Sequence, residues 1–178
     1  MKKFLLSTLA IVSLATFSFA QIAIIPSNNA ANLAQSLAGN GVTISNAVLS
    51  SGTNGAGSFT ANPNTGLGIA NGVVLSTGNV GNIPQAASVF SSTGNGGPTD
   101  ADLSTLSSNP IDDAARLTFS VTPLGNKLTF RYVFASEEYP EYVCSNFNDV
   151  FGFFITGVNP NGPNYNNLNL QGHKPLRL

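Results

Sequence analysis

A two-residue alternation of apolar and polar side chains in the second half of the chain is the strongest constraint on its fold. Residues 115–121 and residues 127–134 both follow this period. Successive side chains of a β-strand point to opposite faces, so each segment predicts a strand with one buried face. The predicted buried side chains are Leu117, Phe119, Val121, Leu128, Phe130, Tyr132 and Phe134. Turn-forming residues 123–126 separate the two segments, which predicts an antiparallel hairpin.

Other segments extend the β pattern. Residues 150–156 are apolar on both faces, which is typical of a central strand. Shorter strands are predicted at residues 42–45, 47–49 and 72–76, whereas residues 50–68 and 78–98 predict long loops. We therefore expect a mainly β fold, built as an antiparallel two-sheet β-sandwich of jelly-roll-like form.

One short helix is expected near the N-terminus. Asn28 or Asn29 can cap it, and the apolar residues Ala30, Leu33, Ala34 and Leu37 recur at helical spacing. Gly39 stands where a C-terminal cap is expected.

The first 20 residues predict a secretory signal peptide. Lys2 and Lys3 precede an apolar run from Phe4 to Phe19, and the predicted cleavage site lies near Ala20. The run is shorter than the roughly 20 apolar residues that span a bilayer, and no longer run follows it. The mature chain is expected to be secreted or placed at the cell surface, without a transmembrane segment.

The composition of the chain limits the classes of binding partner. Charged residues make up 8% of the chain, and loss of Lys2 and Lys3 reduces the seven basic residues to five, against eight acidic ones. A chain with this net negative charge is not expected to bind nucleic acid. Its uncharged polar residues and 42% hydrophobic content fit an extracellular β domain with many turns.

An acidic, aromatic loop lies between the predicted strands 127–134 and 150–156. All eight acidic residues of the chain fall between Asp100 and Asp149. Carboxylate and amide oxygens are the ligands that calcium prefers. The candidate calcium ligands are Glu137, Glu138, Asn148 and Asp149. A structural role is the alternative, in which Glu137 or Glu138 pairs with Arg116 or Arg131 and Asp149 caps a turn.

The same loop carries candidate ligand-binding side chains. Tyr139, Tyr142 and Asn146 combine aromatic faces with a directional amide, as a glycan or peptide site requires. They can equally pack as a small core of the loop itself.

The lone cysteine, Cys144, has two open interpretations: a free thiol, or a thiol whose partner lies outside this chain. Neighbouring Glu137 and Glu138 diverge on an extended backbone, so they do not suit a glycosidase pair. We expect no catalytic residue and no cofactor other than calcium.

The run from Arg131 to Ile155, RYVFASEEYPEYVCSNFNDVFGFFI, resembles the signature of the choice-of-anchor L domain family. Three upstream motifs follow the family's order: residues 72–78, 100–103 and 113–119. The resemblance implies a module of bacterial secreted or cell-surface proteins, some of them type IX secretion substrates of Bacteroidetes. It implies a domain over residues 21–169. Residues 170–178 depart from the family pattern, and we expect them to be an atypical tail of a truncated member that lacks its last strands, the partner of Cys144 and its anchor.

These observations predict a non-enzymatic surface module for adhesion or ligand binding, with an extracellular glycan or protein surface as its partner. A glycan-active enzyme, or its accessory carbohydrate-binding domain, is the alternative.

Overall fold

Seven strands and one α-helix form in the part of the chain that the computed structural model describes, residues 22–83, 93–136, 142, 145, 149–159 and 161–170. The elements are β1 (Ile22–Pro26), α1 (Ala30–Ser36), β2 (Val42–Ser50), β3 (Ala56–Ala61), β4 (Asn71–Leu75), β5 (Arg116–Pro123), β6 (Phe154–Gly157) and β7 (Tyr165–Asn169). The predicted signal peptide, residues 1–20, and residues 171–178 of the predicted tail lie outside these ranges.

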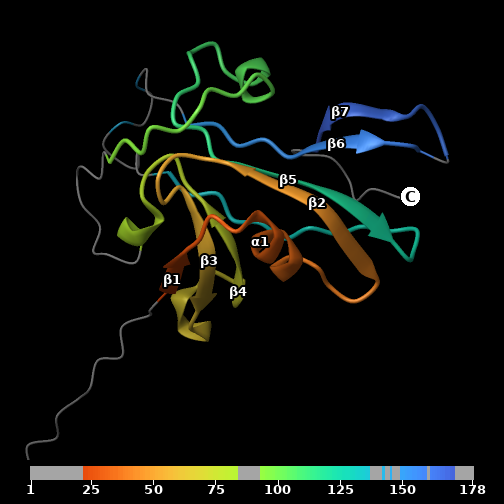
Figure 1. Ribbon diagram of the computed structural model, residues 1–178, viewed down its shortest axis with the longest axis horizontal. Coiled ribbons are helices and arrows are strands. Elements are labelled where there is room, and N and C mark those ends of the chain that lie inside the picture. The colour runs from red at the N-terminus through yellow and green to blue at the C-terminus, as the bar shows by residue number, and fades with distance from the viewer. Residues whose placement is uncertain are drawn as a thin grey trace, which may run out of the picture.

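Every strand pair is antiparallel, and the strands form three sheets (Figure 1). β3 lies between β1 and β4, β2 pairs with β5, and β6 pairs with β7. The predicted mainly β, antiparallel fold with one short helix near the N-terminus is confirmed. The finer two-sheet, jelly-roll-like sandwich stays a prediction.

Helix α1 begins as the sequence predicts. The Asn29 side chain accepts a hydrogen bond from the Asn32 backbone N–H at 3.0 Å, and Leu33 is buried where the helix contacts β2. The helix ends earlier than expected, because its C-cap is Leu37 rather than Gly39. Leu37 keeps a right-handed backbone with φ of −84°, so the helix ends without a left-handed glycine.

Strand β2 joins two segments that the sequence analysis kept apart. Residues 42–45 and 47–49 belong to one strand whose register against β5 shifts between Ser45 and Val48. Asn46 lies at this irregularity with a left-handed φ of 52°. One extra residue in β2 therefore forms a β-bulge, and Asn is among the side chains that tolerate such a backbone.

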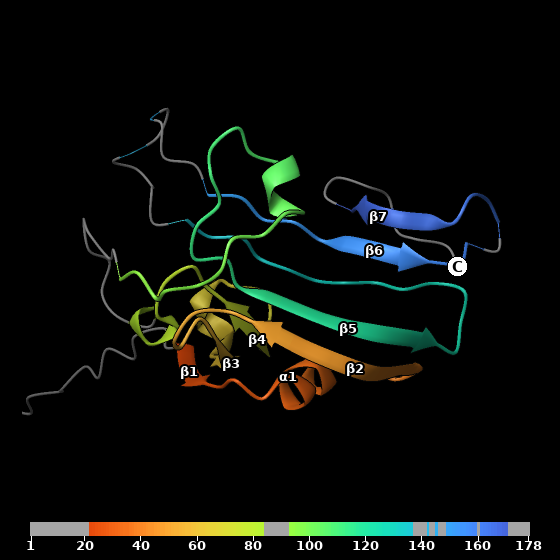
Figure 2. The same cartoon turned by 45° about the horizontal axis from the view of Figure 1, so that its top comes forward.

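Strand β5 confirms the alternation of residues 115–121, since Leu117, Phe119 and Val121 are less exposed than their polar neighbours. The predicted hairpin between this strand and residues 127–134 is wrong. Residues 128–136 form no strand, although Figure 2 shows the chain reversing after β5 and running back as an extended segment. β5 pairs instead with β2, from Arg116 opposite Ser50 to Pro123 opposite Val42.

Two further predictions change. The predicted loop 50–68 contains β3, in which Gly57 lies so close to the backbone of β1 that an added Cβ would sit 2.6 Å from the Ile25 carbonyl oxygen. Because this contact is tertiary, the local sequence of β3 gives little sign of it. The predicted central strand 150–156 is regular only in β6, which lies in a two-stranded sheet with β7.

The buried apolar core of the described residues consists largely of small side chains: Leu33, Ala34, Ala56, Ala61, Val80, Ala114 and Leu128. Asn95 supplies much of the polar bonding around it. Its amide nitrogen donates to the Gly78 carbonyl at 3.0 Å, and its side-chain oxygen accepts from the Gly97 N–H at 3.0 Å. Its backbone carbonyl accepts from the Thr53 N–H. Asn95 thus holds the loop after β2 against the loop after β4.

Replacement of Gly52 by Ala should destabilise the protein, because the added Cβ would lie 2.0 Å from Oδ1 and 2.4 Å from the backbone oxygen of Asn95. Overpacking of this kind costs about 1–3 kcal/mol in the free energy of unfolding. Urea denaturation measures the loss. Gly125→Ala is the matched control, because an added Cβ there meets no atom within 4 Å. Equal stability of the two variants would contradict the proposed packing around Asn95.

Candidate functional site

The loop predicted to carry the site lies mostly outside the described residues. The loop residues outside the described ranges include Glu137, Glu138, Tyr139, Cys144, Asn146 and Asn148. Tyr142 and Asp149 are described. The Ser136 hydroxyl donates to Oδ2 of Asp149 at 2.6 Å, which brings together the two chain segments that enter and leave the loop. The predicted calcium and ligand-binding residues therefore remain predictions, and Asp149 has a structural contact.

Aromatic rings line the two segments next to the loop. The rings of Phe130 and Phe153 have centroids 4.4 Å apart, and those of Tyr132 and Phe151 are 5.1 Å apart. Phe134 also lies near Phe151, with centroids 6.1 Å apart. The contacts join alternate residues of segments that run in opposite directions, as side chains on one face of antiparallel extended chains do. We call these five residues the aromatic strip.

The aromatic strip is more exposed than the sequence predicted. Leu128 is buried, but Tyr132 is 57% exposed, Phe134 is 50% exposed and Phe130 is 37% exposed. The expectation of a buried face over residues 127–134 is therefore wrong beyond Leu128, because no described element packs over these rings. Contiguous exposed apolar surface of this kind marks interaction sites in soluble proteins.

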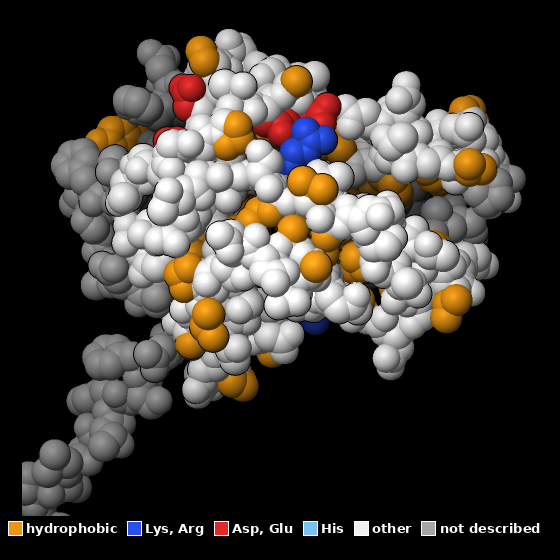
Figure 3. Space-filling model, in the orientation of Figure 1, with side chains coloured by type: hydrophobic (Ala, Val, Ile, Leu, Met, Phe, Trp, Pro, Cys, Tyr) orange, Lys and Arg blue, Asp and Glu red, His pale blue; other side chains and the backbone are white. Residues whose placement is uncertain are grey.

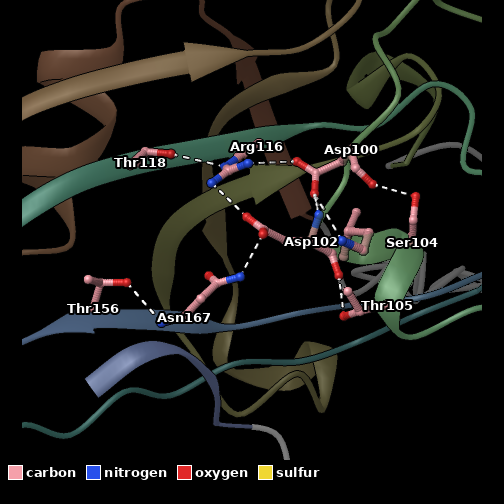
Figure 4. Close-up of polar contacts among 9 residues, drawn as sticks. Asp100, Asp102, Ser104, Thr105, Arg116, Thr118, Thr156 and Asn167 are labelled. Atoms are coloured by element: carbon pink, nitrogen blue, oxygen red, sulfur yellow. Dashed lines mark hydrogen bonds and ion pairs between the residues drawn. The ribbon is translucent and has the colours of Figure 1, made fainter. Parts of the chain in front are cut away.

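A second polar cluster centres on Arg116 (Figure 4). Its guanidinium contacts Oδ2 of Asp100 at 3.1 Å and Oδ2 of Asp102 at 2.8 Å. The other oxygen of Asp102 accepts from the Asn167 amide at 2.6 Å. We call Arg116, Asp100, Asp102 and Asn167 the Arg116 cluster. On the face drawn in Figure 3, most side chains are uncharged, and basic and acidic side chains meet in one cluster.

Asp100 is the most buried charged group of this cluster, with 7% of its side chain exposed. Its Oδ1 accepts from the backbone N–H groups of Asp102 and Leu103, both at 2.9 Å. This bonding starts the 3-10 turn Leu103–Thr105 and leaves Oδ2 for Arg116. Both oxygens of this buried carboxylate are thus bonded to donors of the same chain, which is a structural role.

Among the described residues, Arg116 pairs with Asp100 and Asp102, while Arg131 donates to the Gly68 carbonyl. Glu137 and Glu138 lie outside the described residues, so their own pairing stays a prediction. The motif at residues 100–103 held the signal for this cluster, since two aspartates at that spacing can both face one arginine.

A pocket of about 450 Å³ opens where β1, β2 and β3 meet. Its lining residues are all uncharged: Pro26, Ser27, Asn28, Leu49, Ser51, Gly52, Thr53, Asn54, Gly55 and Ala56. Hydrogen bonds from Thr53 N–H to the Asn95 carbonyl and from Val80 N–H to the Asn54 carbonyl fix its wall. This pocket was not predicted, because residues 50–68 were expected to be loop. Hydroxyl and amide groups without a charge suit a neutral, hydrogen-bonding ligand.

In the described part of the chain, no three His, Cys, Asp or Glu side chains come together as metal ligands. Within the same ranges, every helix is too short or too polar to cross a membrane.

These features define a mainly β domain that joins a structural ion cluster to an exposed aromatic strip. The chain belongs to the choice-of-anchor L domain family, whose model matches residues 23–174. Membership identifies a module of the secreted or cell-surface class and is consistent with a protein that is not an enzyme. Neither a curated protein nor a solved structure matches the sequence significantly.

Replacement of Arg116 by Met should lower the free energy of unfolding by about 2 kcal/mol, because it leaves the buried Asp100 carboxylate without its cation. The loss falls below that of a fully buried pair, since the Arg116 side chain is 47% exposed. Urea denaturation again measures it. Arg131→Met is the control and should stay within about 0.5 kcal/mol of the wild type, because this exposed guanidinium meets a carbonyl rather than a buried charge. Equal losses in the two variants would refute the structural role of the cluster.

Proposed function

We propose that this protein is an exported, non-enzymatic module that binds an extracellular glycan or protein surface through the aromatic strip and the adjoining loop 137–148. The observation that carries the proposal is the exposure of Tyr132 and Phe134, at 57% and 50%, beside that loop. Export uses the predicted signal peptide, with cleavage near Ala20. The family match supports this placement at or beyond the cell surface.

The aromatic strip has the chemistry of a binding surface. Large aromatic side chains dominate interface energies, and tyrosine adds a hydroxyl that can hydrogen-bond a partner. Ring contacts with Phe151 and Phe153 hold Tyr132 and Phe130 in place before a partner arrives. Less side-chain freedom is then lost on binding, which favours affinity.

The loop completes the proposed surface. Tyr139, Tyr142 and Asn146 are its proposed ligand contacts, because aromatic faces and an amide suit the hydroxyl groups of a glycan or the backbone of a peptide. The hydrogen bond between Ser136 and Asp149 supports this arrangement by fixing both ends of the loop at the strip.

Calcium is the proposed cofactor of the loop. Glu137, Glu138, Asn148 and Asp149 would supply oxygen ligands, and extracellular calcium is abundant enough to fill weak sites. Binding there would order the loop next to the aromatic strip.

Glycan recognition at the pocket between β1, β2 and β3 is a second candidate function. Its hydroxyl and amide lining supports this alternative, since a saccharide presents neutral hydroxyl groups. The alternative corresponds to an accessory carbohydrate-binding domain and requires no catalytic residue.

Binding to extracellular glycan and protein arrays should fall at least about tenfold when Tyr132 and Phe134 are both replaced by Ser, since hot-spot aromatic residues each contribute about 2 kcal/mol or more. Because both side chains are exposed, the double substitution should leave the stability of the fold largely unchanged. Circular dichroism melts check this. Leu124→Ser is the control, because Leu124 is 82% exposed but lies in the turn after β5.

The outcome separates the two candidates. Glycan binding that survives the double substitution but is lost in Thr53→Val, which keeps the side-chain volume and removes a pocket hydroxyl, would favour the pocket over the strip. Retention of all binding in the double variant would refute the main proposal.

Calcium should raise the melting temperature of the wild-type protein, by an amount equivalent to about 1.4 kcal/mol when its concentration is ten times the dissociation constant. Asp149→Asn should abolish the shift, because the amide keeps the shape but loses the charge. Ser136→Ala removes the hydrogen bond to Asp149 while keeping its carboxylate, so this variant should still respond. Asp112→Asn controls for general charge. A wild-type melt that ignores calcium and chelator alike would exclude the site.

A further inference from the structure

Five Asn–Gly pairs occur in the chain, at Asn40, Asn54, Asn71, Asn95 and Asn161. Asparagine before glycine is chemically labile, because the glycine nitrogen can attack the side-chain amide carbon without hindrance from a Cβ. The attack needs a side chain that is free to turn and a backbone N–H that is not already bonded. The structure meets these requirements at the five sites to very different degrees.

Asn95 is protected by bonds to its side chain. Its amide nitrogen donates to the Gly78 carbonyl and its oxygen accepts from the Gly97 N–H. Both bonds must break before the amide carbon can approach the Gly96 nitrogen. Local opening of this kind has a free-energy cost that slows the reaction.

Asn54 and Asn71 are protected through the glycine that follows. The Gly55 N–H donates to the Gly52 carbonyl at 3.1 Å, and Gly55 is buried. Asn71 begins β4, where Gly72 pairs with Phe59 of β3. The Phe59 ring lies 3.1 Å from an added Cβ at Gly72, so the backbone there is packed.

Asn40 has none of these protections. It is exposed in the turn between α1 and β2, and its side chain makes no hydrogen bond within the described residues. The Gly41 N–H likewise has no partner in those ranges, and an added Cβ at Gly41 meets no atom within 4 Å. Asn161 is intermediate, since the N–H of the following Gly162 makes only a long hydrogen bond of 3.4 Å to the Asn159 carbonyl.

We propose that Asn40 is a site of spontaneous modification in the folded protein. The Gly41 nitrogen loses its proton and forms a bond to the side-chain carbon of Asn40, and ammonia leaves to give a cyclic imide. Water then opens the ring at either carbonyl, which yields aspartate or isoaspartate at position 40. No oxidant, reductant or enzyme is required.

The product would alter a junction in the fold. The Gly41 carbonyl accepts a hydrogen bond from the Leu124 N–H at 2.8 Å, so the α1–β2 turn is attached to the turn after β5. Isoaspartate adds one backbone atom immediately before this junction, and both products add a negative charge to a chain with few charges. We expect the modified protein to melt at a lower temperature than the unmodified one.

Incubation of the folded mature chain at mildly alkaline pH, followed by peptide mapping with electron-transfer fragmentation, tests the proposal. Isoaspartate at position 40 should accumulate at least about tenfold faster than at Asn54, Asn71 and Asn95, because those sites must first open. In concentrated urea the protection is lost, so the rates at the five pairs should converge.

Asn40→Gln supplies the matched variant, since its longer side chain does not readily form the ring. This substitution should remove most of the added negative charge that accumulates in native wild type on isoelectric focusing. Native rates at Asn54 or Asn95 that equal or exceed the rate at Asn40 would overturn the proposal. Differences among the five sites that persisted unchanged in urea would overturn it as well.

Discussion

The contact of Arg116 with Asp100 and Asp102 joins three parts of the chain that share no sheet. Arg116 lies on β5, the two aspartates lie in the connection before it, and Asn167 on β7 reaches the same cluster through Asp102. A buried carboxylate such as Asp100 is costly without its donors, so the loop and strand β5 must meet in one arrangement. The Asn167 amide then attaches the β6–β7 hairpin to the same cluster, beside the ring contact of Phe153 just before β6.

Elsewhere in the molecule, hydrogen bonds of asparagine side chains hold segments together where bulky apolar side chains are few. The side chains of Asn29, Asn62 and Asn79 cap three short helical segments, and Asn95 links two loops. A core rich in alanine brings backbones close together, which leaves backbone groups that need partners. Amide side chains meet that need without charge, and this explains how a chain with 8% charged residues satisfies its turns.

Local signals in the sequence predicted local structure. The alternation around Phe119 and the Asn29 cap are set by near neighbours, so both were recoverable. The partner of β5 was not, because β2 lies some 70 residues earlier and only the folded chain brings its matching pattern to β5. The surroundings of the candidate site show the same division: the aromatic flanks of the loop can be seen in the sequence, but the partners of Arg116 and the exposure of Tyr132 depend on distant contacts.

The bulge at Asn46 has a consequence for how this domain can change in length. Before it, Val42 and Ile44 face inward, and after it Ala47 and Leu49 do so, which shifts the inward phase by one residue. Loss of Asn46 alone would merge the two halves into one regular alternation, with Ala47 opposite Phe119. Loss of the outward-facing Ser45 would give the same pattern, whereas loss of a residue further from the bulge would turn part of the strand inside out. Single-residue deletions in β2 should thus be accepted at this irregularity and nowhere else in the strand.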